Sequence, residues 1–273
     1  MPRKKTPTPP PLVESLQEQV ESLQEQVQPK ATSHKRPLPY RIAIFVACLA
    51  GLIYLLSFAP TEQREVLWRA LTLQRNLIVP MLVLGLLALS LLWARGQEID
   101  NRVFLFFNLR GRRPRWLDIA LGTFSQLGNG ALAIGLSLYL MRSNPSLSGQ
   151  LALGVLSLSI MVELLKALTD RARPFITNPK ARVVGWREPG RSFPSGHTSQ
   201  IFFLATLLYH HFEPGLGIGI LLYAVAALVG FTRMYVGAHY PRDVIGGALL
   251  GLMWGTLANL IDPYWVPLFT WLG

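Results

Sequence analysis

Charged residues and cysteine are both scarce in this sequence of 273 residues. Asp, Glu, Lys and Arg make up 15% of the chain, compared with about 25% in soluble domains. The single cysteine, Cys48, excludes an intramolecular disulfide and a cysteine-based metal site. The basic N-terminal stretch continues into prolines instead of an apolar segment, so we do not expect a cleavable signal peptide.

Apolar sequence is abundant instead, since 51% of the residues are hydrophobic and the mean hydropathy is +0.33. Several runs approach the roughly 20 residues that a helix needs to cross a bilayer. A soluble core of this size has no need for so many such runs. The sequence therefore predicts an all-α, polytopic transmembrane helical bundle. The runs are 42–59, 77–94, 117–141, 149–168, 198–211, 215–232 and 244–261.

The polar tail, residues 1–40, begins basic and proline-rich and then contains the repeat VESLQEQVESLQEQV. The period of seven places Val13, Val20 and Val27 at one heptad position and Leu16 and Leu23 at another. Two heptads are too few for a stable isolated coiled coil. A solvated tail and a self-association helix at residues 13–27 both remain open.

The formal net charge of +11 has two interpretations. Loops flanking membrane helices are enriched in lysine and arginine, and an affinity for anionic headgroups or phosphate would produce the same excess. Nucleic-acid binding is not expected, because no basic and aromatic module lies outside the apolar runs. Residues 95–115 are predicted to form an arginine-rich loop.

Ionisable residues gather in three segments at the ends of apolar runs, where they are costly unless a function requires them. In KALTDRARP, residues 166–174, the seven-residue spacing predicts that Lys166 and Arg173 project from one helix face before Pro174 ends the helix. The second segment, PSGH at 194–197, opens the next apolar run.

The third segment is TRMYVGAHYPRD, residues 232–243. His239 and Asp243 are four residues apart, which makes them neighbours on a helical turn. Arg233 is off that face in a straight helix, and we expect Gly237 to supply the bend that brings Arg233 and His239 into one pocket.

Together these segments predict a phosphoryl-transfer site. Lysine and arginine beside a helix N-terminus form a cradle for phosphate or another oxyanion. The two histidines could act as nucleophile and acid, and a carboxylate beside one imidazole would fix its tautomer. The sequence shows no carboxylate cluster for Mg²⁺, so it predicts metal-independent transfer through a phosphohistidine, with no cofactor.

The pattern K-x6-RP, then PSGH, then [ST]R-x5-H-x3-D resembles the type 2 phosphatidic acid phosphatase (PAP2) superfamily. Its members include lipid phosphate phosphatases, undecaprenyl pyrophosphate phosphatases and the soluble vanadium haloperoxidases. The resemblance covers roughly residues 98–262, with Thr232 at a position where serine is commonest. The matching residues are Lys166, Arg173, Pro174, Pro194, Ser195, Gly196, His197, Arg233, His239 and Asp243.

The resemblance implies that His239 is the nucleophile, that Asp243 orients it and that His197 protonates the leaving oxygen. It also implies a set of residues that bind the phosphoryl oxygens: Lys166, Arg173, Ser195, Gly196 and Arg233.

The resemblance further implies a six-helix catalytic core at residues 98–262 with its site at the membrane interface. We expect residues 41–97 to form N-terminal spans, one of them additional to the family core, and residues 263–273 to form a short C-terminal segment.

Other polar residues near these segments have more local interpretations. Glu163 is expected to pair with Lys166 on one helix face. For the polar residues of the third run we expect interhelical hydrogen bonds; these are Ser125, Gln126 and Asn129. Three further arginines could extend a phosphate site, particularly for a diphosphate: Arg171, Arg187 and Arg191.

We therefore expect an integral membrane phosphatase of the bacterial inner membrane that acts on lipid phosphate monoesters or diphosphates. A lipid phosphotransferase with the same intermediate, and a non-catalytic transporter or structural protein, are the alternatives. The side of the membrane on which the site lies stays open. The positive-inside rule applied to seven spans places it in the cytoplasm, whereas bacterial relatives generally place theirs on the outer face.

Overall fold

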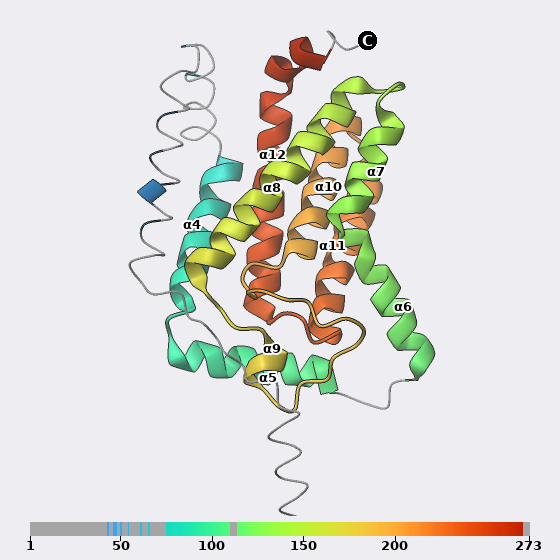
Figure 1. Ribbon diagram of the computed structural model, residues 1–273. Helices are drawn as coiled ribbons and strands as arrows, with labels where there is room; N and C mark the ends of the chain where they lie inside the picture. Colours follow the sequence, from blue (N-terminus) through green and yellow to red (C-terminus); the bar gives the residue numbers. More distant parts are fainter. Residues whose placement is uncertain are drawn as a thin grey trace, which may run out of the picture. The chain divides into compact units, whose positions relative to one another are not determined.

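The computed structural model describes residues 75–109 and 114–269, together with isolated positions between 43 and 65. Within these residues the chain forms helices and loops and no strand (Figure 1), which confirms the predicted all-α class. The polar tail with its heptads and nearly all of the first predicted span, 42–59, lie outside the described residues.

The other six apolar runs all form helices. The helices are α4 (Arg75–Ser90), α5 (Ala94–Leu109), α6 (Arg115–Ser125), a 3-10 turn η1 (Gln126–Gly128), α7 (Gly130–Leu140), α8 (Pro145–Thr169), α9 (Pro174–Thr177), α10 (Gly196–Phe212), α11 (Leu216–Tyr235) and α12 (Pro241–Phe269).

Three stretches among the described residues are long and apolar enough to cross a membrane, those of α8, α11 and α12. The count rises to five if each of two bent pairs is one span: α4 with α5, and α6 with α7. Their outer faces carry exposed leucine and isoleucine side chains, as a lipid-facing surface requires.

Residues 95–115 do not form the predicted loop, because most of them belong to α5. This helix turns by 99° from α4 and runs across the end of the bundle that also holds α9 (Figure 1). One face of α5 is buried at four-residue intervals, at Gly96, Asp100, Phe104 and Asn108. Two polar residues on that face make tertiary contacts, which is why hydrophobicity alone did not reveal the helix.

The prediction that Lys166 and Arg173 share one helix face is wrong. Helix α8 ends at Thr169, and Asp170 caps it in the left-handed conformation with φ 51°. Pro174 begins the short helix α9 instead of ending α8. Arg173 is therefore the residue before a new helix, and its direction is independent of that of Lys166.

Helices α10 and α12 pack closely (Figure 1) through glycines spaced four residues apart on α12. A Cβ on Gly247 would lie 2.6 Å from the Ser195 carbonyl oxygen, and one on Gly251 would lie 2.3 Å from that of Ser199. Small residues at this spacing let the backbones of membrane helices approach. The stripe thereby holds the start of α10 beside the start of α12.

Candidate active site

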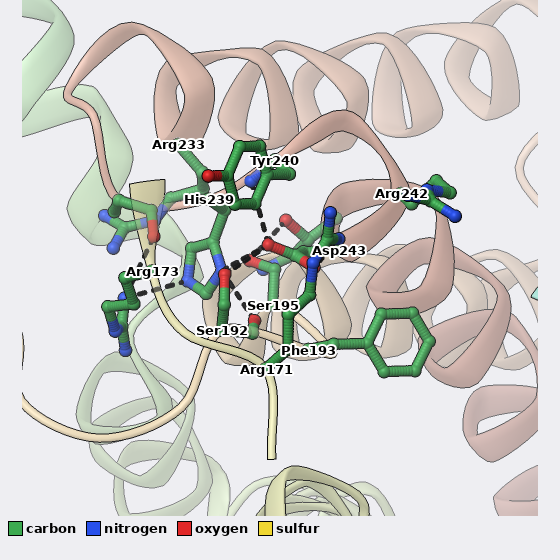
Figure 2. A network of polar contacts seen from close by, with 12 residues as sticks. Arg171, Arg173, Ser192, Phe193, Ser195, Arg233, His239, Tyr240, Arg242 and Asp243 are labelled. Carbon is green, nitrogen blue, oxygen red and sulfur yellow. Dashed lines mark hydrogen bonds and ion pairs between the residues drawn. The ribbon is translucent and has the colours of Figure 1, made fainter. Parts of the chain in front are cut away.

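His239 lies in the turn between α11 and α12 and is almost completely buried. Its Nε2 lies 3.3 Å from Nη1 of Arg173. A guanidinium can only donate, so Nε2 accepts and the ring proton is on Nδ1. Nδ1 then donates to the Ser192 carbonyl oxygen over 2.8 Å. This tautomer directs the Nε2 lone pair towards the arginine (Figure 2).

Asp243 is completely buried and close to His239, with Oδ2 3.6 Å from Nδ1. The same Oδ2 accepts hydrogen bonds from the Ser192 hydroxyl and from the Tyr240 N–H, the latter over 2.8 Å. Oδ1 accepts from Nη1 of Arg171 over 2.6 Å. Asp243 therefore orients the imidazole partly through Ser192, since the Ser192 carbonyl oxygen accepts the hydrogen bond from Nδ1.

Arg173 and Arg233 are both buried and converge near His239 (Figure 2). Nη1 of Arg233 donates to the Ser125 hydroxyl over 2.7 Å. Both guanidinium groups also bind Glu188, Arg173 through Nη1 over 3.0 Å and Arg233 through Nη2. Among the described residues, the Nε of neither arginine has a hydrogen-bond partner. Each guanidinium therefore retains a buried donor for a further acceptor.

The end of α11 brings Arg233 and His239 together through Gly237, as the sequence predicted. Gly237 has φ +87° and follows the last helical turn. The Ala238 N–H returns to the Arg233 carbonyl over 3.0 Å and the Gly237 N–H to that of Met234 over 3.1 Å, which is a Schellman motif. A Cβ at Gly237 would lie 2.2 Å from the Arg182 carbonyl oxygen, so the position requires glycine for two reasons.

The PSGH segment forms the start of α10. The Ser195 side chain caps this helix by accepting from the Thr198 N–H and hydroxyl, over 3.4 and 2.9 Å. The backbone N–H of Ser195 donates to the Asp243 carbonyl oxygen over 2.9 Å. His197 is in the first turn of α10, and its carbonyl would lie 2.5 Å from a Cβ on Gly128. The break between α6 and α7 therefore lets the start of α10 approach.

His197 borders two cavities. The larger, about 760 Å³, is also lined by Ser125, Glu188 and Arg233. The smaller, about 160 Å³, is lined by Lys166 and Gly196. Lys166 donates to Glu163 over 2.7 Å, which confirms the expected pair. Lys166 and Arg233 thus line different cavities, and His197 borders both.

Several residues of the site were missed or misassigned from the sequence. Glu188 is the only acidic residue between Asp170 and Glu213, and that isolation among arginines was the available signal. Ser125 makes the expected interhelical hydrogen bond, from α6 to Arg233 of α11, but the sequence did not show that its partner would be an arginine of the site. Arg171 does not extend the phosphate site, because its terminal nitrogens bind Asp243 and Asp100.

Two ionisable groups in the loops of the site, His239 and Glu188, have strongly shifted pKa values. Burial lowers the pKa of His239 to about 4, helped by Arg173 and Arg233 and opposed by Asp243. Burial alone would raise the pKa of the Glu188 carboxyl, but the nearby Arg233 and the other positive groups hold it at about 2. At neutral pH the imidazole of His239 is therefore an uncharged base and Glu188 is ionised.

Comparisons with known proteins show which family the chain resembles. The family model of the PAP2 superfamily matches residues 148–267. A lipid A 4′-phosphatase of Bacteroides thetaiotaomicron is 32% identical over 177 residues, covering 60% of this chain and 77% of that protein.

Two solved structures are also similar. Aquifex aeolicus LpxE matches with a TM-score of 0.52 and 31% identity, over 57% of this chain and 92% of that one. A transmembrane PAP2-type phosphatidylglycerolphosphate phosphatase from Bacillus subtilis matches with a TM-score of 0.58 and 22% identity, over 69% and 96%. The motifs, the helical bundle and these relatives together identify the chain as a membrane protein of the PAP2 superfamily.

Proposed function

We propose that the protein hydrolyses lipid phosphate monoesters or diphosphates through a phosphohistidine on His239, without a metal ion. The observation that carries this proposal is the direction of the His239 Nε2 lone pair. It faces the buried guanidinium of Arg173, while Nδ1 is held by the Ser192 carbonyl. A neutral imidazole aimed at a cationic cradle is the arrangement that a phosphoryl acceptor needs.

In the first step Nε2 attacks phosphorus and the bond to the leaving oxygen breaks, with His197 donating the proton that this oxygen requires. Arg173 and Arg233 neutralise the phosphoryl oxygens. The imidazolium that forms keeps its proton on Nδ1, which still donates to the Ser192 carbonyl oxygen, and it is stabilised by Asp243. In the second step His197 accepts a proton from water, which attacks the phosphohistidine and releases phosphate.

The substrate class follows from where the site lies. It is at one end of a bundle with lipid-facing helices, so a substrate can stay in the membrane by its tail while its phosphate enters. The larger cavity continues from His197 past the break between α6 and α7 and is lined by polar side chains, among them Gln126 and Asn129. These features favour a polar headgroup in the site, in a protein that we propose to lie in the bacterial inner membrane.

Phosphate release from a panel of lipid phosphates tests the proposal. The purified protein in detergent should release phosphate from at least one of phosphatidate, phosphatidylglycerol phosphate, undecaprenyl diphosphate and lipid A, and EDTA should not reduce the rate. Loss of activity with EDTA would contradict a metal-independent mechanism. Formation of a phosphorylated alcohol when an acceptor is added would favour the phosphotransferase alternative.

The pH dependence of kcat/KM provides a second test. Below its pKa, His239 binds a proton at Nε2 and loses the lone pair that attacks phosphorus, so activity falls as pH falls. Since the pKa is lowered to about 4, the acid limb should lie well below the 6.5 of unperturbed imidazole. The titration of the substrate phosphate itself must be measured separately and subtracted. An acid limb of the free enzyme at or above pH 6.5 would contradict this prediction.

A further inference from the structure

Two buried arginines side by side repel each other unless an anion lies between them. In this structure that anion is Glu188, in the loop between α9 and α10. Its two carboxylate oxygens are divided between the arginines, Oε2 with Nη1 of Arg173 and Oε1 with Nη2 of Arg233. The carboxylate thus binds the residues that are expected to hold the phosphoryl group.

The position of this carboxylate conflicts with that of a substrate. Nη1 of Arg173 lies 3.0 Å from Oε2 of Glu188 and 3.3 Å from Nε2 of His239. Glu188 also lines the larger cavity together with His197. A phosphoryl group positioned for attack by Nε2 would meet Nη1 of Arg173, the donor that Glu188 already uses.

We propose that Glu188 determines specificity by occupying the phosphoryl position of the empty site, so that a substrate binds only by displacing it. This inference rests on the proposed function of the site. When the carboxylate is displaced, the guanidinium groups can bind the phosphoryl oxygens. After phosphate has dissociated, the carboxylate binds the guanidinium groups again.

The loop around Glu188 is built to permit this displacement. Its ends are fixed, by the Val184 N–H on the Val236 carbonyl over 3.0 Å and the Ser192 N–H on the Arg171 carbonyl over 2.8 Å. Between these anchors, Gly185 and Gly190 have φ of +78° and +85° on either side of Glu188. A Cβ at either glycine would meet nothing within 4 Å, so backbone conformation is the reason for glycine there.

Glu188 is also reachable from solvent, since its side chain is 27% exposed whereas those of the two arginines are nearly fully buried. An outward movement of the carboxylate would therefore exchange one anion for another without exposing the cations. Glycines at loop ends can absorb the backbone rotation that such a movement needs.

Because a substrate must exchange its phosphoryl group for the Glu188 carboxylate, the site can discriminate against the bulk lipids of the membrane. A phosphodiester headgroup carries one negative charge at the phosphate, the same as the carboxylate it would have to replace. A phosphomonoester or a terminal diphosphate carries up to two at neutral pH. Competition from the Glu188 carboxylate keeps the affinity of the site for the abundant, singly charged diesters low. A more highly charged phosphoryl group gains enough electrostatic binding energy from the two arginines to replace the carboxylate.

The test is the affinity of the purified full chain for inorganic phosphate, measured by calorimetry. Removing the competing charge in Glu188→Gln should tighten phosphate binding by roughly 10- to 100-fold. Glu98→Gln removes the same charge from an exposed position of α5 and should leave the affinity unchanged. If the Gln variant does not fold, Glu188→Asp serves instead. Glu188→Asp keeps the charge, but its side chain is one methylene too short to reach both arginines. Its affinity for phosphate should therefore be higher than that of the parent and lower than that expected for Glu188→Gln.

Phosphate affinity that is unchanged or weaker in whichever Glu188 variant folds would overturn the inference and leave Glu188 as a support for the arginines. In an active enzyme, Glu188→Gln should lower KM without raising kcat, because the competition affects substrate and transition state alike. Phosphatidylglycerol, a phosphodiester, should inhibit that variant at contents that leave the parent unaffected. If no lipid phosphate is hydrolysed but phosphate binding still tightens, the proposed function fails and the role of Glu188 stands.

Discussion

Replacing His239 with alanine should reduce phosphate release by about 10³-fold or more, since it removes the nitrogen that we propose attacks phosphorus. The ring is buried and makes two contacts, through Nδ1 with Ser192 and through Nε2 with Arg173. Neither partner is itself a nucleophile. The measurement is phosphate release from the best lipid substrate, together with trapping of labelled phosphate on the protein.

His210→Ala provides a matched control, because His210 lies in the last turn of α10, at the opposite end of that helix from His197. It should keep the activity of the parent. The His239 variant should still bind inorganic phosphate, since Arg173 and Arg233 remain. Phosphate release at the parental rate from a folded His239→Ala protein would exclude His239 as the nucleophile.

The parts of the fold that depend on local sequence were predictable. Apolar runs of sufficient length became helices, and the Gly237 turn followed from the spacing of Arg233 and His239. The glycines of α12 that bring α10 close recur every four positions in the sequence, but their role became clear only from the structure. Each of these features can be recognised within one contiguous stretch of the sequence.

The parts that were not predictable depend on partners far along the chain. No periodicity shows that Asp100 meets Arg171 or that Glu188 meets Arg233. The early end of α8 was missed because the left-handed cap is an aspartate, Asp170, a residue that adopts this conformation far less often than glycine. The order of the three motifs was sufficient to indicate the family, whereas the counter-ions of the site had to come from the structure.

These counter-ions form a continuous buried chain that links α5 to the site. Asp243 binds Arg171, which binds Asp100 of α5, and Asp100 also accepts from Nε of Arg242 over 3.0 Å. The Arg171 guanidinium lies over the Tyr240 ring, 4.3 Å from its centroid. The helix that lies across the end of the bundle is thereby coupled to the carboxylate that orients His239.

Replacing Arg171 with methionine should therefore have the largest effect on stability. The substitution keeps most of the side-chain volume but removes the cation from between two buried carboxylates. Asp100 retains Arg242, whereas Asp243 loses its closest cation. Leaving a buried charge without its partner costs about 3–5 kcal/mol, which we expect to appear as a fall of roughly 10 °C in the unfolding temperature in detergent.

The matched control is Arg187→Met, since Arg187 is exposed and its guanidinium lies over the Phe175 ring, 6.0 Å from its centroid. It should change the unfolding temperature little. A double variant, Arg171→Met with Asp100→Asn, removes one of the two carboxylates that the arginine served. The two substitutions should therefore cost less together than the sum of their separate costs. Strict additivity would show that Asp100 and Arg171 do not stabilise each other, and that α5 is held against the site by its apolar contacts and by Asn108, which binds the Arg182 and Tyr235 carbonyls over 2.9 and 3.0 Å.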